Sequence, residues 1–516
     1  MRNLLLAAAI GLCASAVVST AFSSASLANA AVASAPMGED DARHLLNRTG
    51  FGAPPSSVAA LAKLSRQQAV ERLLASARTA PVLTPPTQAP VPPSRIKAAS
   101  EEEKKAMLRA EFEKGAELRG WWLQEMLQTP SPLTERMTLF WHNHFVSSQQ
   151  KVKFSQLMLE QNLLLRRHAL GNFGQLLHAV AKDPAMILYL DSATNRKGQP
   201  NENFAREVME LFTLGEGRYS EQDIKDAARA FTGWSIDRES GEYLWRPMIH
   251  DGETKTVLGR SGHFDGDDVL DILLQQPATA EFVVAKLWRE FISPTPDPAE
   301  IKRVADIFRS SAYDIRQALR ALLLSKAFWA GENRGVLVKS PVDLVVGSVR
   351  TLEVRVPDAL PLAFTVRNLG QDLFAPPNVR GWPGGDAWIN ATTLLARKQF
   401  IERLLRNDEF IAPVVRADGD EGGYAEAGMR SKLRVGELRE EFGKVAGRLE
   451  GDTRMRLVKA LSEIRFDSRA WLSRYPDSAS VERALLAVSA VAPPPAGASG
   501  VALVRSLALD PAYQLK

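Results

Sequence analysis

Cysteine is almost absent from this chain. Of its 516 residues only Cys13 is a cysteine, and it lies in an apolar segment near the N-terminus. Once that segment is removed, the remaining chain has no thiol and can form no disulfide. A cysteine nucleophile and a thiolate-bound metal are therefore excluded as sources of activity. A chain of this length can build a hydrophobic core large enough to fold without disulfides.

Long apolar runs are also scarce. The run near the start follows Arg2 and covers residues 4–18, and Ala28-Asn29-Ala30 supplies the small residues that a signal peptidase requires. This pattern, without a twin-arginine pair, predicts a Sec-type signal peptide over residues 1–30. We therefore expect the protein to be secreted or periplasmic. No later run reaches the roughly 18–20 residues of a membrane-spanning helix, so we expect no transmembrane segment.

Neither sign of charge dominates the chain. Its 64 Lys and Arg residues against 60 Asp and Glu residues give a formal net charge of +4, with acids and bases interspersed. This balance does not suggest a nucleic-acid partner. The chain also lacks a Gly-x-Ser-x-Gly elbow and a phosphate-cradling glycine-rich loop, which argues against a serine hydrolase of that kind and against a nucleotide enzyme.

Helical periodicity is what the sequence has in abundance. Apolar residues recur at helical spacing along most of the chain, and Ser65 and Ser220 stand where N-caps belong. Asp386 is expected to cap a long helix that runs to about residue 405. The fold class is therefore predicted to be all-α, a multi-helix globular domain. The segment 242–259, with an Asp251-Gly252 turn between two short apolar runs, predicts one small β-hairpin insertion.

Changes in composition suggest the domain organisation. Residues 31–416 are predicted to form the main helical domain, interrupted by a proline-rich extended connector over 82–94. A glycine-rich and acidic stretch predicts a linker over 417–431. Residues 432–516 then read as a charged, amphipathic C-terminal helical segment.

The stretch 201–234 looks central to the domain. Read as a helix, its first half places four apolar residues, Phe204, Val208, Leu211 and Phe212, on one stripe. Asn203, Glu207 and Glu210 follow the edge of that stripe. Gly215 and Gly217 end this helix, and a second amphipathic helix follows. The result is a predicted helical hairpin with a polar seam.

Several motifs together resemble those of one large bacterial family. They occur in order between about residues 42 and 405, and they lie at 140–145, 171–173, 183–186, 201–207, 210–215, 231–234, 250–259 and 380–388. This pattern is similar to the family known as domain of unknown function 1800. The resemblance implies a mainly helical, exported protein but no reaction. It also implies a possible partner, because members are often encoded beside an exported sulfatase-like family.

Two histidines are the candidate metal ligands. His142 and His144 are two residues apart, so on a helix they point about 200° from one another. Both can bind one metal, a divalent cation being the class suggested, only if the helix ends there and Asn143 is extended. The alternative is a core histidine hydrogen-bonded to the backbone.

Acidic residues are the candidate catalytic groups. Glu207 and Glu210 are three apart, a spacing compatible with an acid/base pair or with metal ligation. The alternative is an ion-pair lattice with Arg206, Arg229 or Arg166. His250 and Asp251, close to Lys255, form a second candidate pair in which the carboxylate orients the imidazole, and a simple Asp-Gly turn is its alternative.

The candidate substrate-binding residues lie in two places. A loop rich in glycine and proline carries Arg380, Trp382 and Trp388, and the two indoles are suited to stack on sugar rings. Asn203 and Arg206 lie beside the acidic pair. For the tryptophans the alternative is packing that closes the helical core.

Two hypotheses about function follow. If the clusters at 141–144, 201–210, 250–255 and 380–388 converge in one cleft, the protein is an exported hydrolase that acts on an extracellular polymer such as a polysaccharide. If these residues are instead paired in the interior, it is a non-enzymatic envelope or assembly scaffold that binds an exported partner. The reaction, the substrate and the identity of any metal stay open.

Overall fold

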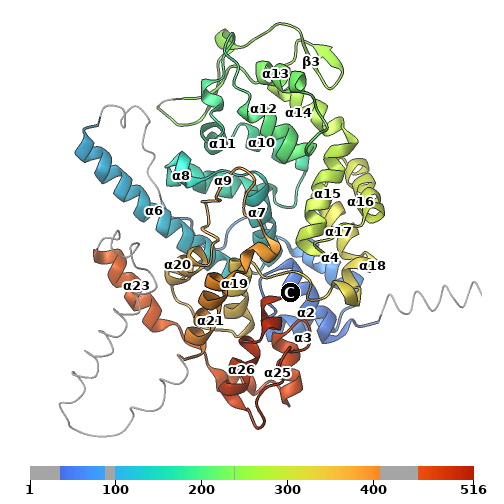
Figure 1. Ribbon diagram of the computed structural model, residues 1–516, viewed down its shortest axis with the longest axis vertical. Coiled ribbons are helices and arrows are strands. Elements are labelled where there is room, and N and C mark those ends of the chain that lie inside the picture. The colour runs from blue at the N-terminus through green and yellow to red at the C-terminus, as the bar shows by residue number, and fades with distance from the viewer. Residues whose placement is uncertain (1–34, 88–98, 238, 407–450) are drawn as a thin grey trace, which may run out of the picture.

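The computed structural model describes residues 35–87, 99–237, 239–406 and 451–516 (Figure 1). Within these ranges the protein is mainly helical and has two small two-stranded sheets, which confirms the predicted all-α class. The predicted signal peptide, the linker at 417–431 and part of the proline-rich connector lie outside the described residues. None of the helices in the described ranges has an apolar stretch long enough to cross a lipid bilayer.

The described helices pack around two large hydrophobic cores. The first core contains mostly residues from the N-terminal and middle parts of the chain. The helices that contribute to this core alone are α2 (Gly38–Thr49), α3 (Pro55–Ala62), α4 (Arg66–Ser76), α10 (Phe173–Ala181), α12 (Asn203–Glu207), α13 (Glu221–Ala230), α14 (Gly266–Gln275), α15 (Pro277–Phe291), α16 (Pro298–Ser310), α17 (Ile315–Leu323) and α18 (Lys326–Trp329).

The second core joins the long helix α6 to helices from the last third of the chain. Its helices are α6 (Glu101–Gln128), α8 (Gln149–Val152), α19 (Pro341–Thr351), α20 (Leu360–Asn368), α21 (Ala391–Arg406), α24 (Ser468–Leu472), α25 (Ser478–Leu485) and α26 (Gly500–Ala508). Helix α23 (Gly451–Glu463) packs against α6 and α20 in a small third cluster. The described C-terminal helices α24 to α26 therefore share a core with α19 to α21.

Three helices contribute residues to both large cores: α7 (Pro132–His144), α9 (Ser155–His168) and α11 (Pro184–Tyr189). Helix α7 places Met137 and Trp141 in the first core and Leu139 in the second. In Figure 1 it lies near the middle of the molecule, between the upper helices of the first core and the lower helices α19 and α21. Side chains on opposite sides of α7 therefore enter different cores.

Local capping explains where several helices begin. Ser65 forms a capping box with Gln68 at the start of α4, and Ser220 forms one with Asp223 at the start of α13, which confirms both predicted N-caps. Asp386, which we expected to cap a long helix, lies instead in the short 3₁₀ helix η5 (Gly385–Trp388). Helix α21 begins at Ala391, where the amide of Thr393 donates to the side chain of Asn390 at 2.9 Å.

Four short strands form two separate antiparallel hairpins. Strand β1 (Trp234–Ile236) pairs with β2 (Tyr243–Trp245), and β3 (Lys255–Val257) pairs with β4 (Arg260–Gly262). The two segments that we expected to pair with one another, 243–245 and 254–258, therefore each have a different partner. The Asp251-Gly252 turn lies between β2 and β3 and does not close a hairpin, and Asp251 pairs with Arg229 on α13.

The remaining described elements are short helical turns. They are η1 (Ser192–Thr194), η3 (Pro247–Ile249), η4 (Gly331–Asn333) and η7 (Pro511–Gln514), with a π-helical turn, η2 (Val208–Thr213), that follows α12 directly. The central stretch 201–234 is thus a helical hairpin as expected, but its first helix changes from α to π geometry after Glu207.

Candidate functional site

The first half of the central hairpin ends in a π-helical turn. Thr213 donates its hydroxyl to the carbonyl of Val208 at 2.5 Å, and the amide of Leu214 donates to the carbonyl of Met209 at 2.8 Å. The second is a backbone bond that spans five residues, one more than in an α-helix, and the first is a side-chain bond across the same turn. Turns of this kind are rare and are found frequently at functional sites. The turn η2 carries Glu210, so it decides where that carboxylate points.

Glu210 is held by two donors from other parts of the chain. The hydroxyl of Tyr219 donates to its Oε2 at 2.6 Å, and Nη2 of Arg380 lies 3.0 Å from its Oε1. The other end of the Arg380 guanidinium pairs with Glu216 at 2.8 Å. The carboxylate of Glu210 is therefore fixed in position by a hydroxyl and a guanidinium.

Glu207 has no such partners. Its side chain makes no hydrogen bond or ion pair with any other described residue, although it is only partly exposed. Burial and the charge of Glu210 raise the pKa of Glu207, against the opposing influence of Arg380 and Arg206. The two carboxylates of the predicted pair therefore have different environments. We call Glu207, Glu210, Tyr219 and Arg380 the acidic seam.

A partly exposed aromatic residue lies close to Glu207. Burial, and then the charge of Glu207, raise the pKa of Tyr189. The ammonium of Lys151 lies 5.7 Å from the centroid of the Tyr189 ring and 2.7 Å from Oδ2 of Asp191. Asn203, a predicted binding residue, donates to the same Asp191 oxygen at 3.3 Å. These groups form a polar border on one side of the acidic seam.

The arginines that we considered as partners of the glutamates bind elsewhere. Arg206 pairs with Glu221 at 2.8 Å and with Glu202 at 3.1 Å. Arg229 and Arg166 pair with other carboxylates, Asp251 and Glu135. The expected lattice around Glu207 and Glu210 is thus corrected: its cation is Arg380, which is 170 residues away from Glu210 in the sequence.

His144 contacts the backbone of the π-helical turn η2. Its Nε2 lies 3.1 Å from the carbonyl of Phe212, and its Nδ1 lies 3.0 Å from the ammonium of Lys286, which also donates to the carbonyl of Leu211 at 2.9 Å. Burial lowers the pKa of His144 and lowers that of Lys286 to about 7. Nε2 therefore carries the proton, and Nδ1 accepts from Lys286. Both nitrogens of His144 are used in holding η2.

His142 points to the opposite side of α7. Its ring lies among Trp122, Phe374 and Trp382, each with its centroid 5.6 Å away. Burial lowers the pKa of His142 to about 3, so the ring is neutral. Because α7 continues to His144, the condition for a shared metal is not met, and the predicted metal pair is corrected to two separate core histidines. No three His, Cys, Asp or Glu side chains in the described ranges are grouped to hold a metal ion.

The two candidate stacking tryptophans are part of the second core. Trp382 and Trp388 are 5% and 7% exposed, so neither offers a face to a substrate, and the expectation of stacking platforms is corrected. The amide of Trp382 donates to Oδ1 of Asn143 at 2.7 Å. Gly381, with φ +83°, passes so close to Asn143 that a Cβ there would lie 2.2 Å from its Oδ1. This contact brings the neighbouring Arg380 to the acidic seam.

The His250 cluster is a separate structural unit. The carboxylate of Asp251 accepts a hydrogen bond from Nε of Arg229 at 2.8 Å. The buried ammonium of Lys255 donates to the carbonyls of Asp251 and Glu253. His250 contacts the carbonyl of Thr232 through Nδ1 at 2.9 Å. In the described part of the chain, no hydrogen bond or ion pair joins this cluster to Glu207 or Glu210. The two predicted catalytic pairs therefore have separate sets of hydrogen-bond and ion-pair partners.

The acidic seam thus combines residues from two of the four predicted clusters, Glu207 and Glu210 from one and Arg380 from another, and helix α7 supports both through His144 and Asn143. Sequence reasoning missed Tyr219, Tyr189, Glu216 and Lys286. The contact of Tyr219 could have been predicted from the sequence, because the turn marked by Gly215 and Gly217 returns the chain past Glu210 within nine residues. The other contacts depend on helices that pack together only in the folded protein.

Fold and seam define a mainly helical protein with a pair of unequal carboxylates at a π-helical turn. The chain belongs to the family described as protein of unknown function (DUF1800), whose family model matches residues 44–515. This match confirms the resemblance inferred from the motifs. No curated protein and no solved structure matches the chain.

Proposed function

We propose that this protein is an exported hydrolase that acts on an extracellular polymer such as a polysaccharide, and that the acidic seam is its catalytic site. The observation that carries the proposal is the difference between the two glutamates. Glu207 has a raised pKa and no partner in the described ranges, whereas Glu210 is bound by Tyr219 and Arg380. Hydrolases that use two carboxylates need such an unequal pair, one kept protonated and the other ionised.

The chemistry follows from these two environments. Glu207 donates its proton to the leaving oxygen of the scissile bond as that bond breaks. Glu210 accepts a proton from a water molecule, whose oxygen bonds to the carbon left behind. Solvent exchange then returns the proton from Glu210 to Glu207. General acid or base assistance of this kind typically contributes roughly 10²–10⁴-fold in rate.

The surroundings of Glu207 suit a polymer with neutral, hydroxyl-bearing units. Tyr189, whose pKa is raised by burial and by the charge of Glu207, supplies a partly exposed aromatic ring, and Asn203 and Asp191 supply an amide and a carboxylate at the same border. Aromatic faces and short polar side chains are the usual contacts of sugar rings. Export rests on the predicted signal peptide over residues 1–30.

The test compares Glu207→Gln with Glu202→Gln on purified mature protein and a panel of polysaccharides and other polymers. Glu202 is partly exposed and pairs only with Arg206 among the described residues, so its variant is a matched control for the loss of one charge. We expect Glu207→Gln to lower kcat roughly 10²–10⁴-fold and Glu202→Gln to leave it within about twofold. Equal effects of the two substitutions, or no turnover of any polymer by the native protein, would contradict the hydrolase.

A second candidate function is a non-enzymatic envelope or assembly scaffold. It is favoured by a specific observation: His144, His250, Asp251 and Trp382 are all occupied in internal contacts. Its proposed partner is a co-exported sulfatase-like protein. Under this proposal the purified partner binds the native protein and its Glu207→Gln variant with equal affinity, and neither protein turns over any polymer.

A further inference from the structure

Helix α15 contacts the end of the π-helical turn η2 through two side chains. Phe282 and Lys286 are four residues apart on α15, so they lie on the same face of this helix. Gly215, just beyond η2, passes so close to Phe282 that a Cβ at Gly215 would lie 3.1 Å from Cδ2 of the ring. Nζ of Lys286 lies 4.7 Å from the centroid of the same ring. The two side chains together form the surface of α15 on which the turn ends.

The last carbonyls of η2 accept hydrogen bonds from outside the turn. The last four carbonyl groups of a helix have no partner within the helix itself. Nζ of Lys286 donates to the carbonyl of Leu211 at 2.9 Å, and the next carbonyl, that of Phe212, lies 3.1 Å from Nε2 of His144. Nζ also lies 3.0 Å from Nδ1 of His144. Lys286 therefore bonds one of these carbonyls directly and orients the histidine that bonds the other.

Glu210 comes directly before these two residues in the turn. The hydrogen bonds of the Leu211 and Phe212 carbonyls fix the backbone at this point, and the backbone sets the direction in which the Glu210 side chain leaves it. That direction brings the carboxylate to the hydroxyl of Tyr219 at 2.6 Å and to Arg380 at 3.0 Å. Lys286 is thus connected to the carboxylate of Glu210 through the turn, without touching it.

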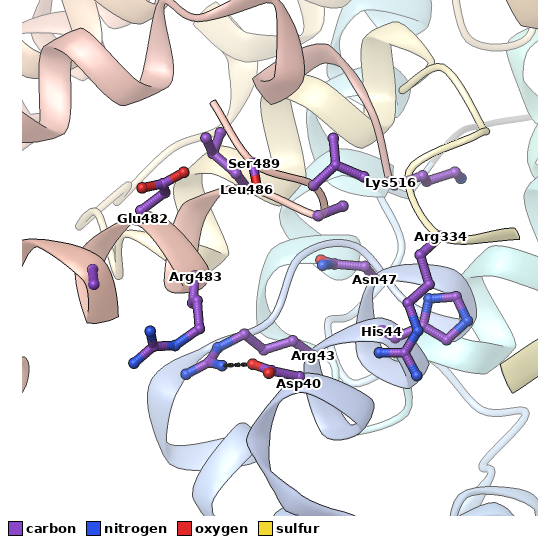
Figure 2. Close-up of a pocket in the computed structure, with 13 residues that line it drawn as sticks. Asp40, Arg43, His44, Asn47, Arg334, Glu482, Arg483, Leu486, Ser489 and Lys516 are labelled. Atoms are coloured by element: carbon purple, nitrogen blue, oxygen red, sulfur yellow. Dashed lines mark hydrogen bonds and ion pairs between the residues drawn. The ribbon is translucent and has the colours of Figure 1, made fainter. Parts of the chain in front are cut away.

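Lys286 makes these contacts without a carboxylate partner among the described residues. In the pocket of about 460 Å³ between α2 and α25, by contrast, Arg43 pairs with Asp40 at 2.9 Å, as Figure 2 shows. Burial and the charge of Arg289 lower the pKa of Lys286 to about 7. An apolar side chain of similar length, such as that of methionine, would avoid the cost of placing an amine here. The bonds that the amine makes to η2 and His144 are therefore what explains a lysine at this position.

We propose that Lys286 is a positioning residue for Glu210, which acts through the π-helical turn η2 and through His144. Its amine holds the end of the turn, and the turn in that form directs the carboxylate of Glu210 to Tyr219 and Arg380. The consequence for catalysis rests on the proposed hydrolase. The effect of Lys286 on the position of Glu210 does not depend on it.

The first experiment detects the position of Glu210 without any substrate. The ¹³Cζ resonance of Tyr219 in mature protein with labelled tyrosine responds to the hydrogen bond that the hydroxyl donates to Glu210, and Tyr219→Phe assigns the signal by removing it. Glu210→Ala gives the chemical shift of Tyr219 without its acceptor. We expect Lys286→Met to move the Tyr219 resonance at least halfway from its native position to that of Glu210→Ala.

Lys339→Met is the matched control, because Lys339 has a similar environment in another part of the molecule. Its ammonium donates to the carbonyl of Tyr513 at 2.7 Å and lies 3.9 Å from the centroid of that ring. Burial lowers the pKa of Lys339 to about 7 as well. Lys339→Met should leave the Tyr219 resonance at its native position. An unchanged resonance in Lys286→Met, or equal shifts in the two variants, would overturn the proposal.

A chemical rescue separates the role of the amine from that of side-chain volume. Without the predicted signal peptide, which contains Cys13, the chain has no cysteine, so Lys286→Cys introduces a single thiol. Its thiolate displaces bromide from bromoethylamine, and the new carbon–sulfur bond gives a thioether of the length of lysine that ends in an amine. Iodoethane reacts in the same way and adds an ethyl group without the amine. Mass spectrometry confirms one added group in each form.

We expect the aminoethyl form to have the native Tyr219 resonance and the ethyl form to have the shifted one. Identical resonances in the two forms would overturn the proposal, because volume alone would then determine the position of Glu210. Both forms are made from one variant, so this comparison decides the proposal even if Lys286→Met does not fold.

The last experiment measures catalysis on a polymer that the native protein hydrolyses. A small displacement of a catalytic group can cost about 10²-fold in rate, so kcat should fall roughly 10²-fold in Lys286→Met and in the ethyl form, with KM nearly unchanged, and should recover in the aminoethyl form. Equal kcat in all forms would contradict the positioning role. If the native protein hydrolyses no polymer, the hydrolase proposal fails, whereas the Tyr219 resonance still decides whether Lys286 positions Glu210.

Discussion

Two clusters of charged residues in this protein differ in how deeply they are buried and in how completely their charges are paired. Around Asp343, which is 5% exposed, Arg136 and Lys516 are also buried, and every carboxylate oxygen has a cationic donor. In the acidic seam, Arg380 has a side chain that is 64% exposed, and Glu207 has no partner in the described ranges. The first cluster connects elements of the fold, whereas in the second one carboxylate makes no hydrogen bond or ion pair with another described residue.

This difference in burial and pairing indicates which charged groups contribute most to the stability of the fold. Removal of one partner from a buried ion pair leaves an uncompensated charge in a medium of low polarity, whereas a partly exposed carboxylate keeps most of its hydration. The Asp343 cluster also joins α7, α19 and the end of the described chain at Lys516. We therefore assign Asp343 to folding and, under the proposed function, Glu207 to catalysis, and the predictions below test that division.

The largest effect is expected from Asp343→Asn. It leaves Lys516 without its carboxylate and Arg136 with Glu290 alone, and the loss of one partner from a buried ion pair typically costs about 3–5 kcal/mol of unfolding free energy. Burial raises the pKa of Asp343, but the charges and hydrogen bonds of Arg136 and Lys516 outweigh burial and hold that pKa well below its usual range. The contribution of Asp343 to stability is therefore present above the unfolded pKa and is lost only as the solution becomes strongly acidic. The measurement is urea denaturation at pH 7.

Asp306→Asn on α16 is the control, since Asp306 is 60% exposed and pairs with Lys302 on the same helix. It should change stability by less than about 0.5 kcal/mol. Equal costs for the two variants would show that the Asp343 cluster is not a structural element of the kind described.

Gly381→Ala is expected to have the next largest effect, on the loop that brings Arg380 to the seam. A methyl group at Gly381 would collide with Oδ1 of Asn143, in addition to the strain of a positive φ. Gly384→Ala is the matched control: its φ is +71° and its Cβ would meet no atom within 4 Å. Gly381→Ala should cost roughly 1–3 kcal/mol more than Gly384→Ala in thermal denaturation. The reverse order would mean that the Asn143 contact does not hold this loop.

Tyr219→Phe is expected to have a smaller effect. It removes the hydroxyl that donates to Glu210 at 2.6 Å and should cost about 0.5–1.5 kcal/mol. Tyr243→Phe is the control, because the Tyr243 hydroxyl makes no hydrogen bond to another described residue. If the hydrolase proposal holds, Tyr219→Phe also lowers kcat, and Tyr243→Phe does not. If the two variants have the same melting temperature and the same activity, the hydrogen bond from Tyr219 to Glu210 contributes to neither stability nor catalysis.

The smallest effect is expected from Glu207→Gln, and its sign depends on pH. Because the pKa of Glu207 is raised in the folded protein, the folded state binds the proton more strongly than the unfolded state. Native stability therefore falls as pH rises from the unfolded pKa, about 4.3, through the raised folded value. Glu207→Gln lacks this penalty, so it should melt slightly higher than the native protein at pH 7 and at the same temperature below pH about 4.

The gain should stay below about 1 kcal/mol, because Glu207 is partly exposed and solvent screens its interactions. Melting temperatures measured from pH 3 to pH 8 test this prediction. A clear loss of stability at pH 7 would show that Glu207 has an ion-pair role after all, and the division between the two clusters would fail.

Several features of the fold follow from nearby residues and were predictable. The capping boxes at Ser65 and Ser220 each involve residues three apart, so sequence alone places the starts of α4 and α13. The apolar stripe through Phe204 and Val208 likewise depends only on helical spacing. By contrast, segments 243–245 and 255–257 were recognisable as strands, but their pairing was not, because strand partners are chosen by contacts across the molecule.

The sequence by itself determined the helical class, the family and the presence of two glutamates near one helix edge. Only the tertiary structure decided that Glu210 is held and Glu207 is not. The cation of Glu210 comes from a loop 170 residues away, and the carbonyls of the π-helical turn are satisfied by His144 and Lys286 from two other helices. Local sequence encodes the propensity of a segment, whereas partners and pKa values depend on which distant groups packing brings within hydrogen-bond distance.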